Sequence, residues 1–282
     1  MPLDENHADP RTASRPVSLP IACGDWPDLS RETAWSSCNP GSRRSAPASR
    51  CRIRRRHGAA GAIVSSAAPH ARLLLDAARE RLRPLGLVQR GRSRTWLDDR
   101  GWWVGVASFG PSSFARGTYL DVGVHWLWQD EDDVSFDVLD PRDSVGFVPY
   151  ESDEQFAPHA ASLAERAAAV VVEYRRRFPT VESAAEHLVR SDTFLDCLDA
   201  GIALGLLGDT SGSRSMFRRY TAWFESDEES EWRDEIDEVR YERARLLNAL
   251  ADARDRFAER IAADVRRCRA ALKLDPDVPL PF

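Results

Sequence analysis

The chain has 282 residues, a formal net charge of −6 and 43% hydrophobic residues, which is enough apolar material for a sizeable core. This length allows about two domains, and no apolar run approaches the roughly 20 residues that a membrane-spanning helix needs. The composition excludes a helical membrane protein and a wholly disordered chain. The first residues do not have the pattern of a secretory signal, so we expect a soluble cytoplasmic protein.

Residues 1–64 differ in composition from the rest of the chain. They hold ten Arg against six acidic residues, and no helical or strand period runs through them. We therefore expect a disordered, Arg-rich arm that is dispensable for folding. A second interpretation is that the arm is an extension upstream of the true start, at Val64. A third, which we do not favour, is nucleic-acid binding through seven Arg with no acid between them: Arg43, Arg44, Arg50, Arg52, Arg54, Arg55 and Arg56.

Residues 65–150 carry the pattern of an α+β sheet domain. Apolar residues recur at helical spacing from Pro69 to Leu85, and Gly86 is expected to end this helix. Segments rich in Trp, Val, Phe and Tyr follow, and the short polar connections between them predict an antiparallel meander packed on the helix. We expect its strands at 87–98, 101–109, 117–128 and 134–139.

Side chains alternate along the third of these segments, which is typical of a half-buried strand. One face is apolar and should meet the first helix; it holds Leu120, Val122, Val124, Trp126 and Trp128. The other holds Tyr119, Asp121, Gly123 and His125. Aromatic residues this dense usually form core, but a sheet with Trp on both faces can also expose a binding patch. As a candidate binding surface we name Tyr119, Asp121, His125, Trp102 and Trp103.

Residues 70–130 also carry an ordered set of short motifs. These are Leu82-Arg83-Pro84-Leu85-Gly86-Leu87, then Thr95-Trp96, the stretch 102–109, and a strand that ends in Gly123-Val124. In this order they resemble the DUF4304 family of bacterial proteins. The resemblance implies a helix followed by an aromatic strand, a hydrophobic strand and a strand with a Gly-Val pair. That family has no assigned activity, so the resemblance implies no functional residues.

From residue 151 the hydrophobic period becomes helical, and 151–228 is expected to be a helical region. An apolar stripe from Phe156 to Phe178 predicts a helix that stops at Pro179, and Thr180 is expected to cap a second helix that runs to about residue 190. Two more helices are expected at about 194–207, ended by Gly208, and at about 211–224. The small residues of the first of these two permit close helix packing.

The last segment, 229–275, contains neither Gly nor Pro. We expect one long C-terminal helix with coiled-coil character, because spacings of four and three alternate along its apolar positions. The seam, with one Arg in it, consists of Trp232, Ile236, Val239, Arg243, Leu246, Leu250, Ala253 and Phe257. The stripe has to be covered. We expect it to pack on the helices of 151–228, with pairing to a second copy as the alternative.

No motif for catalysis, metal binding or cofactor binding is found. The five Cys and six His show no metal-ligand spacing, so we expect reduced thiols and neither a metal nor a cofactor. Asp121, four residues from His125, is about 13 Å away at the rise of a strand, which is too far for a hydrogen bond. We therefore expect no catalytic residue.

These observations favour a non-enzymatic binding or protein-interaction module, with another protein as its partner through the helical region. The first alternative is an enzyme that acts on a small molecule in an aromatic-lined pocket of the sheet. The second is nucleic-acid binding through the arm. A deep pocket with converging polar groups would favour the enzyme, and salt-sensitive DNA binding that is lost without the arm would favour the second alternative.

Overall fold

The computed structural model describes residues 69–129, 131–191, 193–226 and 235–282. The expected arm over 1–64 lies outside these residues, as does the beginning of the expected last helix. The fold is α+β, as predicted: the described ranges hold a five-stranded antiparallel sheet and seven α-helices. No helix in these ranges is long and apolar enough to cross a bilayer.

The sheet is a meander in which neighbouring strands follow one another along the chain. Its strands are β1 (Val88–Gln89), β2 (Thr95–Asp99), β3 (Trp103–Pro111), β4 (Gly117–Trp126) and β5 (Val145–Pro149). The segment expected as one strand over 87–98 is a hairpin of β1 and β2, because Gly91, with φ +56°, turns the chain.

The strand expected at 134–139 is wrong. This segment forms a single bridge, from Val138 to Val124, and the fifth strand lies further along the chain. The carboxylates of Asp133 and Asp140 accept backbone N–H groups of their own neighbourhood, at 2.8 and 2.9 Å. Such side-chain bonds compete with a strand ladder, so the segment runs beside β4 as an irregular loop, joined to it by backbone hydrogen bonds at Val124.

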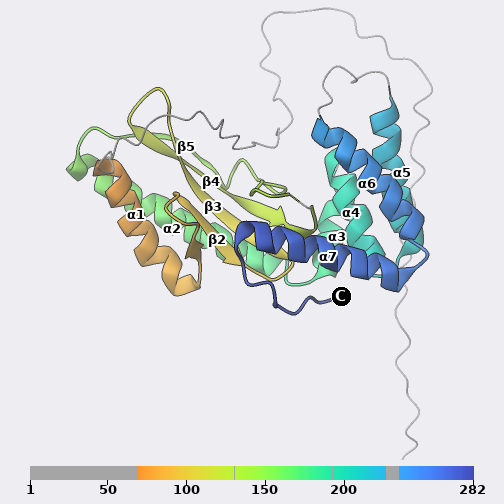
Figure 1. Ribbon diagram of the computed structural model, residues 1–282. Helices are drawn as coiled ribbons and strands as arrows, with labels where there is room; N and C mark the ends of the chain where they lie inside the picture. The colour runs from red at the N-terminus through yellow and green to blue at the C-terminus, as the bar shows by residue number, and fades with distance from the viewer. Residues whose placement is uncertain (1–68, 130, 192, 227–234) are drawn as a thin grey trace, which may run out of the picture. The chain divides into compact units, whose positions relative to one another are not determined.

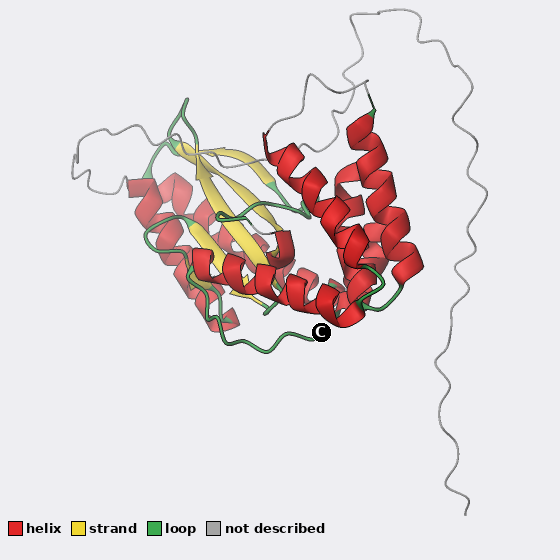
Figure 2. Ribbon diagram, turned by 45° about the vertical axis from the view of Figure 1, so that its right-hand side comes forward, coloured by secondary structure: helices red, strands yellow, loops and turns green. Residues whose placement is uncertain are grey.

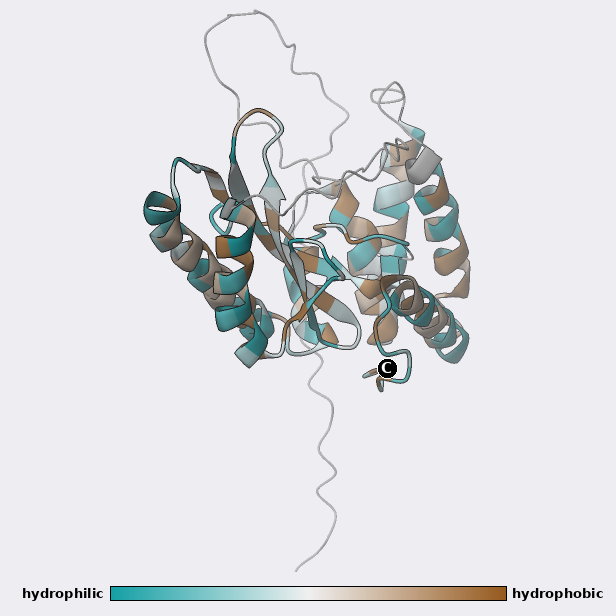
Figure 3. Ribbon diagram, turned by 60° about the vertical axis from the view of Figure 1, so that its left-hand side comes forward, coloured by the Kyte–Doolittle hydropathy of each residue, from teal (hydrophilic) through white to brown (hydrophobic). Residues whose placement is uncertain are grey.

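Two helices cover one face of the sheet. α1 (Pro69–Leu82) and α2 (Asp153–Arg177) lie side by side there (Figures 1 and 2). The apolar face of β4 is fully buried, including Val122 and Val124, and so is the inner side of α1, including Leu74. Hydrophobic residues of the strands, brown in Figure 3, lie between these layers. This confirms that the N-terminal helix packs on the sheet.

The helical region begins where α2 ends, with α3 (Val181–Val189), α4 (Phe194–Leu206) and α5 (Thr210–Glu225). Thr180 caps α3 as expected: its hydroxyl accepts the N–H of Ser183, and the Ser183 hydroxyl accepts the N–H of Thr180. The glycines of α4 permit close packing. A Cβ at Gly201 would lie 2.6 Å from the ring of Phe217.

The single long helix expected over 229–275 is wrong. The structure has two helices, α6 (Glu235–Leu250) and α7 (Arg254–Leu272), which are separated by a turn at 251–253. No Gly or Pro marks the break, and tertiary contacts account for it instead: the hydroxyl of Thr210 donates to the carbonyl of Ala251, and Arg214 pairs with Asp252. After the turn Phe257 is buried against Gly205 of α4.

The expected coiled-coil seam is also displaced. Val239 and Leu246, which were assigned to it, are 69% and 43% exposed, whereas Ala244 and Leu247 are fully buried. α7 then crosses the second face of the sheet, in front of the strands in Figure 1. There the buried Arg269 bonds both carboxylate oxygens of Asp99, at 2.8 Å. The C-terminal segment therefore packs within the chain as two short helices.

Candidate functional site

The structure does not bring the five residues of the expected binding surface together. Trp102 and Trp103 are only 4% and 1% exposed, and the Trp102 ring stacks on Trp126 at a centroid distance of 5.5 Å. Of the five, Tyr119 is 36% exposed and Asp121 is partly buried. The dense Trp residues are core, because burying large indoles removes much apolar surface from water. Trp102 and Trp103 therefore do not contribute to an exposed aromatic surface, contrary to the prediction.

His125, the fifth of these residues, is fully buried in a hydrogen-bonded cluster. Its Nδ1 lies 2.8 Å from the Ser135 hydroxyl and 3.2 Å from Asp137 Oδ2, and its Nε2 lies 3.6 Å from Cys268 Sγ. Burial opposes the charged form, but the bonds and charge of Asp137 and the neighbouring Cys268 raise the pKa of His125 to about 10. The imidazolium therefore ties the loop and α7 to β4.

This cluster was not predictable from spacing. Asp121, on the same strand, is not the partner of His125; the partner is Asp137, which lies in the loop beside β4. Cys268 is 1% exposed, so its thiol has no access to a ligand. The cluster is best understood as the support behind a nearby cavity, because Asp137 belongs to the wall of that cavity.

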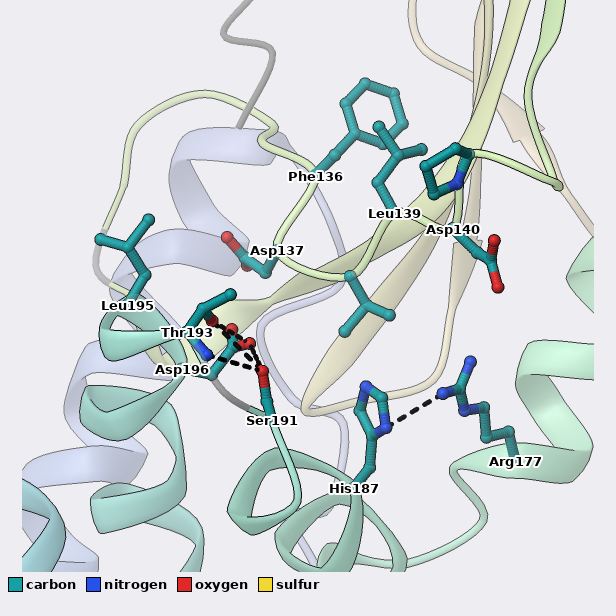
Figure 4. A pocket seen from close by; sticks show the side chains of 12 residues that line it. Phe136, Asp137, Leu139, Asp140, Arg177, His187, Ser191, Thr193, Leu195 and Asp196 are labelled. Carbon is teal, nitrogen blue, oxygen red and sulfur yellow. Dashed lines mark hydrogen bonds between the residues drawn. The ribbon is translucent and has the colours of Figure 1, made fainter. Parts of the chain in front are cut away.

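The cavity has a volume of about 350 Å³. One wall is the loop segment 136–141, and the other is formed by the end of α2, by α3 and by the start of α4 (Figure 4). Phe136, Leu139 and Leu195 make part of its lining apolar. The polar part comes from Asp137, Asp140, Arg177, His187, Ser191, Thr193 and Asp196.

A glycine on β4 sets the position of the loop wall. A Cβ at Gly123 would lie 2.4 Å from the carbonyl oxygen of Val138 and 2.8 Å from the ring of Phe136. Any other residue would push this segment away from the sheet. Gly123 was noted in the sequence as part of the Gly-Val pair, and the close approach of the loop gives a physical reason for it.

Arg177 and His187 form the polar centre of the opposite wall. An Nη2 hydrogen of Arg177 is donated to Nδ1 of His187 over 3.0 Å (Figure 4). Burial and the Arg177 charge lower the pKa of His187, and the Asp196 charge opposes this only in part. The imidazole is therefore neutral at pH 7. Since Nδ1 is the acceptor, Nε2 carries the hydrogen, and in Figure 4 it points away from Arg177 toward the loop wall.

Asp196 provides the acceptor at the far side of the cavity. The hydroxyls of Ser191 and Thr193 both donate to its Oδ2, which holds the carboxylate at the start of α4. Asp140, on the loop wall, is bound by the Arg142 guanidinium, whose hydrogen bonds lower the pKa of Asp140 to about 2. Asp140 is therefore ionised at neutral pH.

The cavity thus combines two side-chain N–H donors, those of Arg177 and His187, with an apolar lining and three carboxylates, those of Asp137, Asp140 and Asp196. Within the described ranges no three His, Cys, Asp or Glu residues are arranged to hold a metal ion. Sequence reasoning did not find Arg177 or His187. Arg177 lies two residues before the corner at Pro179 and His187 lies eight residues after it, so a helix hairpin can bring them together. The sequence does not tell which of three consecutive Arg residues, 175 to 177, faces inward.

Comparison with protein-family models, with curated proteins and with solved structures found no match for this chain. The likeness of residues 70–130 to the DUF4304 family stays a prediction. The function is therefore inferred from the geometry of the cavity.

Proposed function

We propose that this protein binds a small organic anion in the cavity between segment 136–141 and the corner of α2, α3 and α4. The observation that carries this proposal is the state of Arg177. It is partly buried, it donates to a neutral His187, and no carboxylate forms an ion pair with it in the described part of the chain. A guanidinium in that setting is suited to a carboxylate or phosphate group, which it can bind through two parallel hydrogen bonds.

The rest of the cavity restricts the ligand further. A volume of about 350 Å³ is near the lower end of the range for small-molecule sites. The apolar side chains of Leu139 and Leu195 favour a short apolar body next to the anionic group. Asp196 favours a hydrogen-bond donor at the opposite end of the ligand.

The state of His187 favours binding over catalysis. A general base needs a free lone pair within reach of the substrate proton. The lone pair of Nδ1 already accepts the hydrogen of Arg177, and Nε2 is protonated, so His187 acts as a donor to the cavity. This agrees with the non-enzymatic binding module expected from the sequence. The enzymatic alternative required an aromatic pocket in the sheet, where the Trp side chains are buried.

Isothermal titration calorimetry tests the proposal with benzoate and phenyl phosphate as probes and neutral benzamide as the matched control. We expect the anions to bind one per chain, and Arg177→Gln to weaken them at least about tenfold. Arg176→Gln is the control variant, because Arg176 is exposed and pairs with Glu173 on the same helix. Equal binding of benzamide and benzoate, or unchanged affinity in Arg177→Gln, would overturn the proposal.

A further inference from the structure

A second group of cationic side chains gathers at the end of the sheet where β3 turns into β4. His70 lies in the first turn of α1, Arg94 directly precedes β2, and Arg116 belongs to the β3–β4 hairpin. Tyr150 connects two of them: the His70 ring lies 5.3 Å from the ring of Tyr150, and the N–H of Tyr150 donates to the carbonyl of Arg116 over 2.9 Å. None of the three belongs to the cavity described above.

Arg94 is held with its side chain between the layers. Its carbonyl accepts the N–H of Phe109 over 3.1 Å, which places it in the sheet. Alternation along β2 then puts its side chain on the same face as Trp96, which is fully buried under the helices. The Nη1 atom of Arg94 is buried and has no hydrogen-bond partner among the described residues.

His70 is equally short of partners. It is 7% exposed, packed between Tyr150 and Phe156, and in the described structure its Nδ1 has no hydrogen-bond partner. Burial lowers the pKa of His70, and the positive charges of Arg94 and, to a smaller extent, Arg116 lower it further. The electrostatic potential at His70 is therefore positive, and the positive end of the α1 helix dipole, at the first turn, adds to it.

No acidic side chain of the described residues is paired with this charge. Neither Arg94 nor Arg116 forms an ion pair within the part of the chain that the structure describes. Asp153, near Tyr150, accepts the hydroxyl of Tyr150 at 2.7 Å and pairs with Arg72 at 3.8 Å. The segment that leads into α1 cannot supply an acid either, because residues 33–75 contain no Asp or Glu.

We propose that His70, Arg94 and Arg116, with the first turn of α1, bind an oxyanion, a phosphate or a carboxylate group, at a site separate from the cavity. A buried guanidinium without a counter-charge is energetically costly. An oxyanion bound by this guanidinium, by the imidazole and by the N–H groups of the first helical turn removes that cost. Such a ligand also explains why two buried polar atoms on different elements are left without partners.

Thermal unfolding of the full chain tests this inference. The probes are sodium phosphate and sodium acetate, each compared with sodium chloride at equal ionic strength. We expect phosphate or acetate to raise Tm by several degrees more than chloride does, and the more effective of the two identifies the class of anion. Equal responses to all three salts would overturn the inference.

Two variants make the test specific. Arg94→Gln removes the uncompensated charge, so without added anion it should be at least as stable as the wild type, and it should not respond to phosphate or acetate. Arg81→Gln, at an exposed position of α1, removes the same charge and should respond like the wild type. An Arg94→Gln protein that is less stable than the wild type, fails to fold or keeps the response would contradict the inference, because Arg94 would then be structural.

Discussion

Gly123 lies against the backbone of Val138, so closely that a Cβ at 123 would be 2.4 Å from the Val138 carbonyl oxygen. This contact holds the loop wall of the cavity on the sheet. Gly123→Ala should therefore lower the free energy of unfolding by about 1–3 kcal/mol through overpacking and should also weaken benzoate binding, because the wall moves outward.

The matched control for this change is Gly146→Ala. At Gly146 an added Cβ meets no atom within 4 Å, and its φ is not in the left-handed region. Urea unfolding and calorimetry on both variants check the prediction. If Gly123→Ala were as stable as Gly146→Ala and bound benzoate normally, the loop would not be held in the way described.

The ion pair between Arg175 and Asp98 should be important for stability. Arg175 donates to both carboxylate oxygens, at 2.8 and 2.6 Å, and the Asp98 side chain is only 3% exposed. Arg175→Gln leaves a buried carboxylate without its partner, so we expect a loss of about 3–5 kcal/mol. Arg176→Gln removes an exposed pair and should cost less than about 1 kcal/mol. Urea unfolding compares them, and equal losses would contradict the assignment.

His125 should make stability depend on pH above neutrality. Burial would lower its pKa, but Asp137 and Cys268 raise it to about 10 in the folded state, whereas an unfolded His titrates near 6.5. A raised folded pKa contributes stability that is complete below about pH 6.5 and is lost as the pH rises toward 10. The stability advantage of the wild type over His125→Gln should therefore shrink between pH 7 and pH 10.

The control for the pH measurement is His159→Gln, at an exposed position of α2. Its difference from the wild type should stay flat over the same range in urea unfolding at each pH. A pH-independent difference for His125→Gln would show that the folded imidazole is neutral, and the charged link between β4, the loop and α7 would be wrong.

The buried face of α6 can be tested by comparing substitutions at two neighbouring residues, Leu246 and Leu247. Leu247 is fully buried and its neighbour Leu246 is 43% exposed. Leu247→Ala should cost about 2–5 kcal/mol, and Leu246→Ala about 1 kcal/mol or less. Urea unfolding of the two variants checks this. The reverse order would restore the heptad register expected from the sequence.

Local signals in the sequence predicted the elements whose ends depend on local chemistry. Thr180 was recognised as a cap because its hydroxyl bonds within its own turn, and the alternation along β4 followed from burial of one face. The break at 251–253 was missed because contacts from Thr210 and Arg214, far away in the sequence, determine it. The same holds for the site: Arg177 and His187 meet through a helix corner, and Asp137 reaches His125 through a loop.

The most direct test of the account is a crystal structure of the full chain grown with 4-bromobenzoate, whose bromine can be located by its anomalous signal. We predict one bromobenzoate in the cavity, with its carboxylate against Arg177 and the Nε2–H of His187 and its ring against Leu139 and Leu195. A cavity without ligand at a saturating concentration, or a ligand whose carboxylate points away from Arg177, would contradict the proposed function.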